Sequence, residues 1–296
     1  MQFSALDNSA IVFSEEALKG KTYVCRECNN LLGIKQAPYL KKYFFHLYPN
    51  PKCHQNHKNP THLAIQKALL NLLPYGKLEH YFPTIRRIAD IVCLKQKLIF
   101  AIQCSPTSLK EVEERIKGYE SLGFTTIWIL HEQHFNQKKL SPAEYYLRRR
   151  FCYFTSIDTS GMGVFYDQLE FFKSYHRLYK GPPLILESLV PKPLHQIPKN
   201  FPKILKEKLK NTPLYLSGDL TTLLLKRVDS NWAQILEKTY IQKPSFFIRL
   251  LAYLKDFFLY LLKMNASQDY SSSEHKPAAM QNREKQLNTD QNRSLL

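Results

Sequence analysis

The chain has 296 residues, 44% of them hydrophobic and 13% aromatic. That composition excludes a disordered chain and allows one large domain or two small ones. With 42 Lys and Arg residues against 25 Asp and Glu residues, the formal charge is +17. This excess favours a polyanionic partner, either nucleic acid or an anionic membrane surface, over a basic surface that only keeps the protein soluble. We expect nucleic acid first.

Two features of the chain indicate a cytoplasmic protein. The first twenty residues contain acidic side chains and no apolar stretch long enough for a secretory signal. The six cysteines also lack the even spacing of a secreted disulfide scaffold. We predict three metal ligands and three buried thiols, namely Cys25, Cys28 and Cys53 in the first group and Cys93, Cys104 and Cys152 in the second.

Changes in composition divide the chain into four pieces. Residues 1–60 are rich in Cys, His, Asn and Lys and have little periodicity. Residues 61–152 follow as helix, strands, helix and strand, which predicts an α/β core. Residues 153–265 are mixed, interrupted by prolines, and predicted to be mainly helical. Residues 266–296 have so little apolar content that we expect a disordered tail.

The predicted elements of the second piece have clear boundaries. A helix begins at Thr61, a candidate N-cap, and stops at Pro74–Gly76. Two segments rich in β-formers follow, separated by the polar "KQK", which predicts a hairpin. The next helix has Ser108 as its N-cap and ends at Gly123. The apolar run "FTTIWIL" then predicts a strand covered on both faces.

A cluster of cysteines and histidines in the first piece predicts a structural zinc site. Two cysteines two residues apart can grip one tetrahedral ion, and a closed site needs two more nitrogen or sulfur ligands. The alternative is free thiols with surface histidines. The expected ligands are Cys25, Cys28, His46 and Cys53, with His57 as the substitute for Cys53.

The stretch "RRIADIVCLKQKLIFAIQCS", residues 86–105, looks like half of a nuclease active site. Asp90 lies in one predicted strand and Gln103 ends the next. Metal-dependent phosphodiester cleavage uses carboxylates from neighbouring strands to hold Mg2+ or Mn2+, and a nearby lysine or glutamine to orient the attacking water. A second carboxylate is normally needed at about this place in the second strand, where this chain has Ala101.

From about Cys25 to Leu130 the chain resembles the competence protein CoiA-like family. The resemblance is carried by the Cys-x-x-Cys with a later "FFH", by "RRIAD" and "AIQCSPTS", by "TTIWIL", and by single residues between them. These single residues are His62 and Lys67 on the first helix, Glu79 on the first strand, and Arg115 and Tyr119 on the second helix.

The resemblance implies a fold, a partner and site residues. The fold is a restriction-endonuclease-like domain of the PD-(D/E)xK type, preceded by a small zinc-ribbon-like segment. The implied partner is single-stranded DNA entering the cell during transformation, together with competence or recombination proteins. By position, Asp90 corresponds to the first acid of the motif, and Gln103 lies where the family has glutamine instead of lysine.

Because Ala101 replaces the expected Glu, two hypotheses about catalysis remain open. In the first, Glu79 is the replacement acid of an active Mg2+-dependent deoxyribonuclease, with Lys97 or Lys67 as its ammonium group. In the second, the chain keeps the nuclease fold only to bind DNA. For Glu79 a structural ion pair with a neighbouring arginine is an alternative, and Glu113 and Glu114 are expected on a solvated helix face.

Several basic residues are candidates for contacts with DNA. Arg86, Arg87 and Lys110 are expected to follow the phosphate backbone, so that binding weakens with salt. Arg115 is expected to clamp a phosphate, while Tyr119, four residues on, is expected to pack against the sheet. A different class of function is a membrane-associated scaffold at a DNA uptake machine, with peripheral contact through the apolar residues 245–265.

Overall fold

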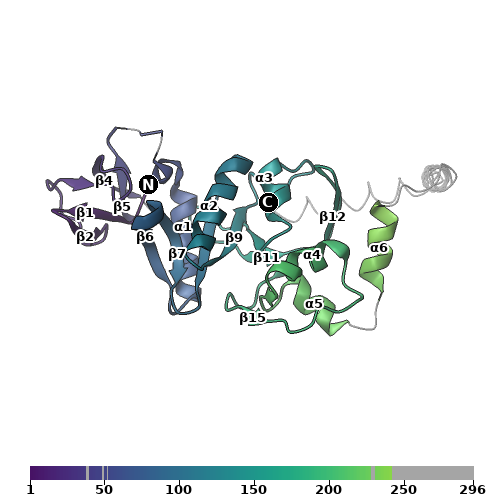
Figure 1. The fold of residues 1–296 in the computed structure, drawn as a ribbon. Helices are drawn as coiled ribbons and strands as arrows, with labels where there is room; N and C mark the ends of the chain where they lie inside the picture. Colours follow the sequence, from purple (N-terminus) through teal and green to yellow (C-terminus); the bar gives the residue numbers. More distant parts are fainter. Residues whose placement is uncertain (38–39, 49, 52, 228–230, 242–296) are drawn as a thin grey trace, which may run out of the picture. The chain divides into compact units, whose positions relative to one another are not determined.

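The computed structural model describes residues 1–37, 40–48, 50–51, 53–227 and 231–241. The N-terminal part forms an antiparallel five-stranded sheet in the order β2-β1-β3-β4-β5 (Figure 1). Its strands are β1 (Ser4–Asp7), β2 (Ala10–Phe13), β3 (Tyr23–Val24), β4 (Leu31–Ala37) and β5 (Leu40–His46).

A seven-stranded mixed sheet forms the second part, in the order β14-β11-β10-β9-β8-β7-β6. Its central strands β8, β9 and β10 are parallel, and the strands on both sides pair antiparallel. The strands are β6 (Lys77–Phe82), β7 (Arg87–Cys93), β8 (Leu98–Gln103), β9 (Thr125–His131), β10 (Cys152–Thr155), β11 (Phe165–Asp167) and β14 (Leu184–Ile185).

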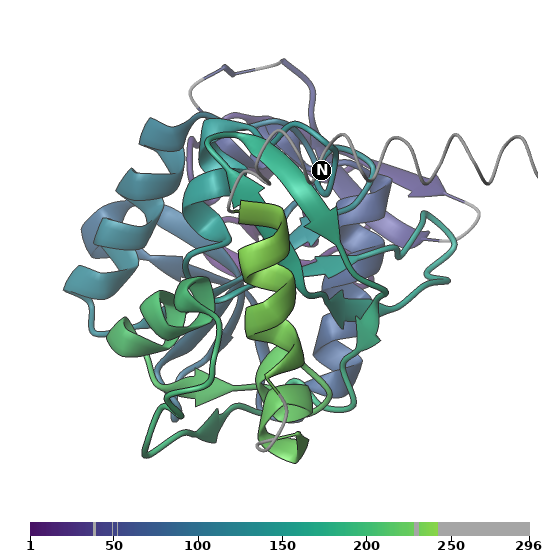
Figure 2. The same cartoon turned by 90° about the vertical axis from the view of Figure 1, so that its right-hand side faces the viewer.

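Two helices cover opposite faces of this sheet (Figure 2). On one face, α1 (Pro60–Leu72) buries Ile65 and Leu69 against strands β7 and β8. On the other face, α2 (Leu109–Ser121) buries Val112 and Ile116 against β9. The order helix, three antiparallel strands, helix, parallel strand is the α/β core that the pattern predicts.

Capping residues explain where the two helices begin. Ser108 caps α2 and accepts a hydrogen bond from the backbone N–H of Glu111, as predicted. For α1 the predicted N-cap is wrong, because Asn59 caps the helix and Thr61 lies inside its first turn. Pro60 takes the first helical position, where its missing N–H is not needed, and the Asn59 side chain accepts from the backbone of His62.

The hairpin and the buried strand are also confirmed. Strands β7 and β8 are joined through a turn that includes the predicted "KQK", with Lys97 in the left-handed conformation. Strand β9 pairs with parallel neighbours on both sides, and its last five residues are buried. The continuous apolar run follows from this position in the middle of the sheet.

Beyond β10 the chain adds short strands and then a helical region, which is the predicted mixed and helical part. The seven-stranded sheet itself continues past residue 152 through β10, β11 and β14. The remaining elements are α3 (Pro142–Leu147), β12 (Glu170–Lys173), β13 (His176–Lys180), β15 (Lys192–Pro193), α4 (Lys203–Asn211), β16 (Leu214–Tyr215), α5 (Leu220–Lys226) and α6 (Trp232–Ile241), with the 3-10 turns η1 (His54–His57) and η2 (Pro83–Ile85).

Within the described residues, none of the helices is long and apolar enough to cross a membrane. The apolar segment 245–265, for which membrane contact is the alternative to packing on the domain, and the predicted tail 266–296 both lie outside the described residues.

Candidate functional site

The four predicted metal ligands come together at one end of the strands of the N-terminal sheet. Cys25 and Cys28 follow β3, His46 is the last residue of β5, and Cys53 precedes η1. Their ligand atoms all lie within 4.8 Å of one another. The Sγ atoms of Cys25 and Cys53 are 3.8 Å apart, and Cys28 Sγ lies 3.3 Å from His46 Nε2.

This geometry fits a tetrahedral zinc ion. With Zn–S bonds of about 2.3 Å, two thiolates on one tetrahedral ion are separated by about 3.8 Å. Three sulfurs and one imidazole nitrogen fill all four positions, which leaves none for a substrate. The cluster could therefore hold a structural metal ion such as zinc. The side chain of His57, the predicted substitute, lies outside the described residues.

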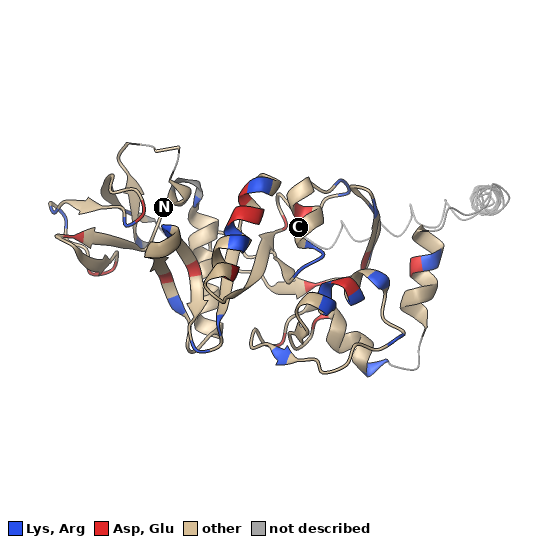
Figure 3. Cartoon of the chain, in the orientation of Figure 1, with Lys and Arg blue, Asp and Glu red and all other residues tan. Residues whose placement is uncertain are grey.

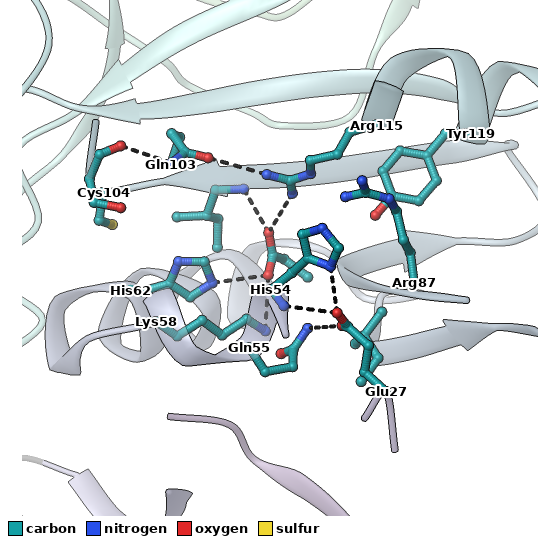
Figure 4. Close-up of a pocket in the computed structure, with 14 residues that line it drawn as sticks. Glu27, His54, Gln55, Lys58, His62, Arg87, Gln103, Cys104, Arg115 and Tyr119 are labelled. Carbon is teal, nitrogen blue, oxygen red and sulfur yellow. Dashed lines mark hydrogen bonds and ion pairs between the residues drawn. The ribbon is translucent and has the colours of Figure 1, made fainter. Parts of the chain in front are cut away.

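A cleft of about 470 Å³, counted with the part open to solvent, lies around Asp90. It lies where β7 and β8 meet α2 and the N-terminal end of α1 (Figure 4). Basic and polar side chains dominate its lining. They are Glu27, His54, Gln55, Lys58, His62, Arg87, Asp90, Gln103, Ser105, Arg115 and Tyr119.

Asp90 is the centre of this site and is only 2% exposed. Its Oδ1 lies 2.9 Å from His62 Nε2 and 3.1 Å from Lys58 Nζ. Its Oδ2 accepts a 2.9 Å hydrogen bond from the backbone N–H of Ile102 and lies 3.6 Å from an Arg115 nitrogen. Donors from both helix-covered faces of the sheet thus converge on one carboxylate (Figure 4).

The charges of this group follow from its burial. Burial by itself raises the pKa of Asp90, but the Lys58 ammonium and the hydrogen bond from His62 outweigh it and hold the pKa well below its usual range. Burial lowers the pKa of His62, so its ring is neutral at pH 7 and donates its Nε2–H to the carboxylate. Asp90 is therefore an anion whose charge is balanced by Lys58 and Arg115.

Glu79 lies beside Asp90 on the neighbouring strand. The ladder between β6 and β7 pairs Leu78 with Ile91 and His80 with Ala89, so its register brings Glu79 opposite Asp90. Glu79 has a positive φ of 49°, which L-residues rarely adopt and which turns its side chain out of the regular strand pattern.

The Glu79 carboxylate is completely buried and already fully bonded. One oxygen accepts from the backbone N–H groups of Phe3 and Ser4 and from the Ser4 hydroxyl, at 2.8–3.0 Å. The other accepts from Lys58 Nζ at 3.1 Å. Burial raises the pKa of Glu79, and the Lys58 charge lowers it to a net value below normal. Lys58 therefore lies between two carboxylates, 3.1 Å from each.

Ala101 occupies the matching place on the other side of Asp90. The β7–β8 ladder pairs Ile91 with Phe100 and Val92 with Ile99, so its next step brings Ala101 opposite Asp90. Ala101 is 1% exposed and packs in the apolar cluster beneath α2, beside Val112 and Trp128. The methyl group supplies no ligand where the sequence motif predicts a carboxylate.

Gln103 and Arg115 close the side of the site next to α2. The Gln103 Oε1 accepts from Arg115 at 3.2 Å, and its Nε2 donates to the carbonyl of Ser105. Arg115 also stacks over the Trp128 ring, 4.7 Å from the ring centroid. These contacts hold the guanidinium at the cleft wall while 14% of its side chain stays exposed.

The N-terminal segment supplies the opposite wall. Glu27, between two of the metal-ligand cysteines, accepts from the His54 side chain at 2.5 Å. The His54 ring also lies 3.5 Å from Glu111, which pairs with Arg87 at 2.8 Å. Glu111 and Glu27 raise the pKa of His54 to about 9, so it is cationic at pH 7. Two residues of the cleft wall, Glu27 and His54, are therefore direct sequence neighbours of the candidate metal ligands Cys28 and Cys53.

The structure separates the predicted site residues into two groups. Asp90, Gln103, Arg87 and Arg115 line the cleft, and so do His62 and Tyr119. Tyr119 is also 1% exposed and packs among Phe82 and Phe124, in agreement with the predicted packing role. The other predicted residues do not line the cleft: Glu79 is completely buried, Arg86, Lys110, Lys67 and Glu114 are exposed, Glu113 is half-buried, and Lys97 stacks on Phe124.

Three functional candidates escaped the sequence analysis: Lys58, Glu27 and His54. The ammonium predicted from Lys97 or Lys67 comes instead from Lys58, which lies just before the N-cap of α1 and four residues before His62. None of the three gave a usable signal in the sequence, because only the fold brings Lys58 between Glu79 and Asp90 and the N-terminal segment against α2.

A basic cleft around a buried carboxylate lies on an α/β sheet preceded by a Cys/His cluster, and a family match identifies this domain as nuclease-like. Residues 34–183 match the family model "Competence protein CoiA, nuclease-like domain". Because this match covers half of the chain, the protein belongs to the CoiA family. The comparisons with curated proteins and with solved structures gave no match.

Proposed function

We propose that this protein handles DNA in natural transformation and that its nuclease-like domain binds single-stranded DNA at the Asp90 cleft without cutting it by a two-carboxylate mechanism. The observation that carries the proposal is Lys58. Its ammonium lies between Asp90 and Glu79, in the position where a divalent ion would bridge two acids. A fixed cation there compensates the buried carboxylates but activates no water.

The absence of a second available acid supports the same reading. Ala101 offers no ligand, and Glu79 already accepts four hydrogen bonds. Among the described residues, the only group of metal-ligand side chains close enough to hold an ion is the Cys25 cluster. A magnesium ion at Asp90 would have to displace Lys58 and would gain few charged ligands in return.

The charges of the cleft wall favour a phosphate. Lys58, Arg87, Arg115 and protonated His54 line it together with the acids Glu27 and Asp90. Arg87 and Arg115 keep 13% and 14% of their side chains exposed, so their spare N–H groups can reach a ligand. Asp90 lines this cleft but is only 2% exposed, so a flexible single strand can approach it more closely than a rigid duplex.

The test is a binding and cleavage assay on the full chain with a labelled single-stranded oligonucleotide. We expect Arg115→Gln and Arg87→Gln each to weaken binding about tenfold, as for other charge-assisted contacts. Lys77→Gln, which removes an exposed charge away from the cleft, is the matched control. Unchanged affinity in both arginine variants would overturn the proposal.

The cleavage arm uses Mg2+ or Mn2+ against EDTA, with wild type and Asp90→Asn. The proposal expects intact DNA in every lane and binding retained in Asp90→Asn, because removing an anion from the cleft does not repel phosphate. A second candidate is the metal-dependent deoxyribonuclease with Glu79 as replacement acid, which the position of Glu79 opposite Asp90 favours. Metal-dependent cleavage that Asp90→Asn abolishes would establish that candidate instead.

A further inference from the structure

A second basic cleft lies across helix α2 from the Asp90 site. It holds about 460 Å³, including open solvent, and is lined by the end of α2, the start of β9, the α3–β10 connection and α4. Three of its lining side chains are cationic and one is acidic: Arg149, Arg150 and Lys208 against Glu120. Figure 3 shows the basic positions of α2 and α4 in blue.

Lys208 is a buried cation without a carboxylate partner. Its residue is 7% exposed, and its ammonium lies 4.7 Å from the centroid of the Tyr153 ring. It makes one long hydrogen bond of 3.4 Å, to the carbonyl of Cys152, and within the described part of the chain it forms no ion pair. A buried ammonium normally requires a partner anion, because its desolvation costs several kcal/mol.

The acids that lie near Lys208 are engaged elsewhere. Asp167 and Glu170 line a neighbouring cavity together with Lys208, but both are bonded to Arg148. Asp219 accepts from Tyr153 and from two backbone N–H groups. Within the described residues, the three donors of Lys208 therefore share one hydrogen bond, beside contacts of the ammonium with the Phe151 and Tyr153 rings.

The other side chains of the cleft point to an anion as well. Arg149 is exposed and stacks on Tyr145 at 4.3 Å, which holds its guanidinium without neutralising it. Arg150 pairs with Glu120 at 3.2 Å, so the net charge of the lining stays positive.

We propose that this cleft binds a backbone phosphate of the same single strand that enters the Asp90 site. The proposal rests on the proposed function and adds a second contact point to it. Arg115 and Tyr119 of α2 line the first cleft, while Ile116 and Glu120 line the second. Helix α2 is about 10–12 Å wide with its side chains. A single strand of DNA that crosses this helix therefore meets both clefts.

This phosphate site is partly built from residues that the family model does not cover. The match ends at residue 183, whereas Lys208 lies on α4. The C-terminal region therefore contributes one part of the site, because its helix α4 brings a lysine against the nuclease-like sheet.

The test measures affinity for a single-stranded oligonucleotide at increasing salt, in wild type, Lys208→Met, Arg149→Gln and the control Lys77→Gln. Each lost phosphate contact should weaken binding about tenfold at low salt and reduce the slope of log K against log salt by about 0.7. Lys208→Met keeps the apolar stem, and the exposed Arg149→Gln serves if the buried variant does not fold. Unchanged slopes in both variants, with normal wild-type binding, overturn the second site and leave the proposed function standing.

Inorganic phosphate separates the two proposals. If the wild type binds no DNA, the proposed function fails. The second cleft is then tested by comparing the Tm of the protein in phosphate and in chloride at equal ionic strength. A rise in Tm that Arg149→Gln and Lys208→Met both lose would support an anion site for free phosphate. No rise in the wild type would overturn the site as well.

Discussion

Among the described residues, two networks of buried charged side chains, one around Asp90 and one around Arg148, each combine arginine or lysine with two or more carboxylates. Around Arg148 the pairing is complete. Arg148 bonds Asp167 and Glu170, and Arg177 bonds Glu170 and Glu144 at 2.8 Å each. Both arginine side chains are at most 4% exposed.

Around Asp90 the inner pairs are equally tight, but the outer donors face a cleft. Lys58 is 5% exposed at its side chain, as in the closed network, whereas Arg115 at 14% borders the open space. This difference distinguishes a structural network from a binding site on the same sheet. In the first the donors are used up by the protein, and in the second some remain for a ligand.

Removing the metal from the Cys25 cluster should have the largest effect and should reach only one of the two networks. Structural zinc contributes about 10–16 kcal/mol in small zinc-binding segments. Chelation is therefore expected to unfold the segment that carries Glu27 and His54 and to abolish DNA binding. Hydrogen exchange checks this: protection should fall around the Asp90 cleft and persist around Arg148.

Cys28→Ser provides a second route to the same state, because it removes one ligand without a chelator. An equal loss of hydrogen-exchange protection in both networks would contradict this distinction, because it would mean that the two networks unfold as one unit.

Opening the closed network should cost the most stability of any single charge change. Arg148→Met leaves Asp167 and Glu170 short of a buried cation, which is expected to lower the free energy of unfolding by about 3–5 kcal/mol. Urea denaturation measures it. The neighbour Arg149→Met, exposed to solvent, should change stability by less than about 0.5 kcal/mol. If Arg148→Met also lowers the free energy of unfolding by less than about 0.5 kcal/mol, the Arg148 network does not stabilise the fold.

Lys58→Met tests the open network by taking away its internal cation. Asp90 and Glu79 then lie close together without compensation, and we expect a loss of about 3 kcal/mol. Millimolar Mg2+ should restore part of it, because the two carboxylates become a cation site. The melting temperature with and without Mg2+ is the measurement, and Lys67→Met on α1 is the control. If the same Mg2+ concentration also raises the melting temperature of the wild type, the result would favour the nuclease candidate.

Acid should weaken the protein by the smallest of these effects. The pKa values of Asp90 and Glu79 are lowered by folding, so their stabilisation is complete above the unfolded values near 4 and is lost as the pH falls below them. We expect a loss of about 1–3 kcal/mol as the pH falls from 5 to 2. Asp90→Asn should flatten this dependence, whereas the exposed Glu114→Gln should not.

The local elements were predictable because their causes are local. Ser108 and the run at β9 carry capping and hydrophobic signals that need no tertiary context. The four candidate metal ligands were predictable from residue type, because few roles gather cysteine and histidine in one short segment. The N-cap at Asn59 was missed because the choice between Asn59 and Thr61 depends on where the chain enters the helix, which Pro60 decides.

The interior of the cleft could not be predicted in the same way. Lys58 becomes special only when β6 and β7 bring Glu79 and Asp90 to either side of it, at a sequence distance of 21 residues or more. Ordinary spacing rules apply within one helix or strand, whereas these contacts join three elements. The positive φ of Glu79 likewise follows from its bonds to β1 and not from its residue type.

The lining of the Asp90 cleft comes from two parts of the chain, and this limits how recombination can exchange those parts between related proteins. Glu27 and His54 belong to the segment before α1, and Arg115 belongs to the sheet domain. Exchange of either part alone between two relatives would join half of one cleft to half of another. The sequence has a natural break near residue 60, but the unit that recombination must keep whole spans both sides of it.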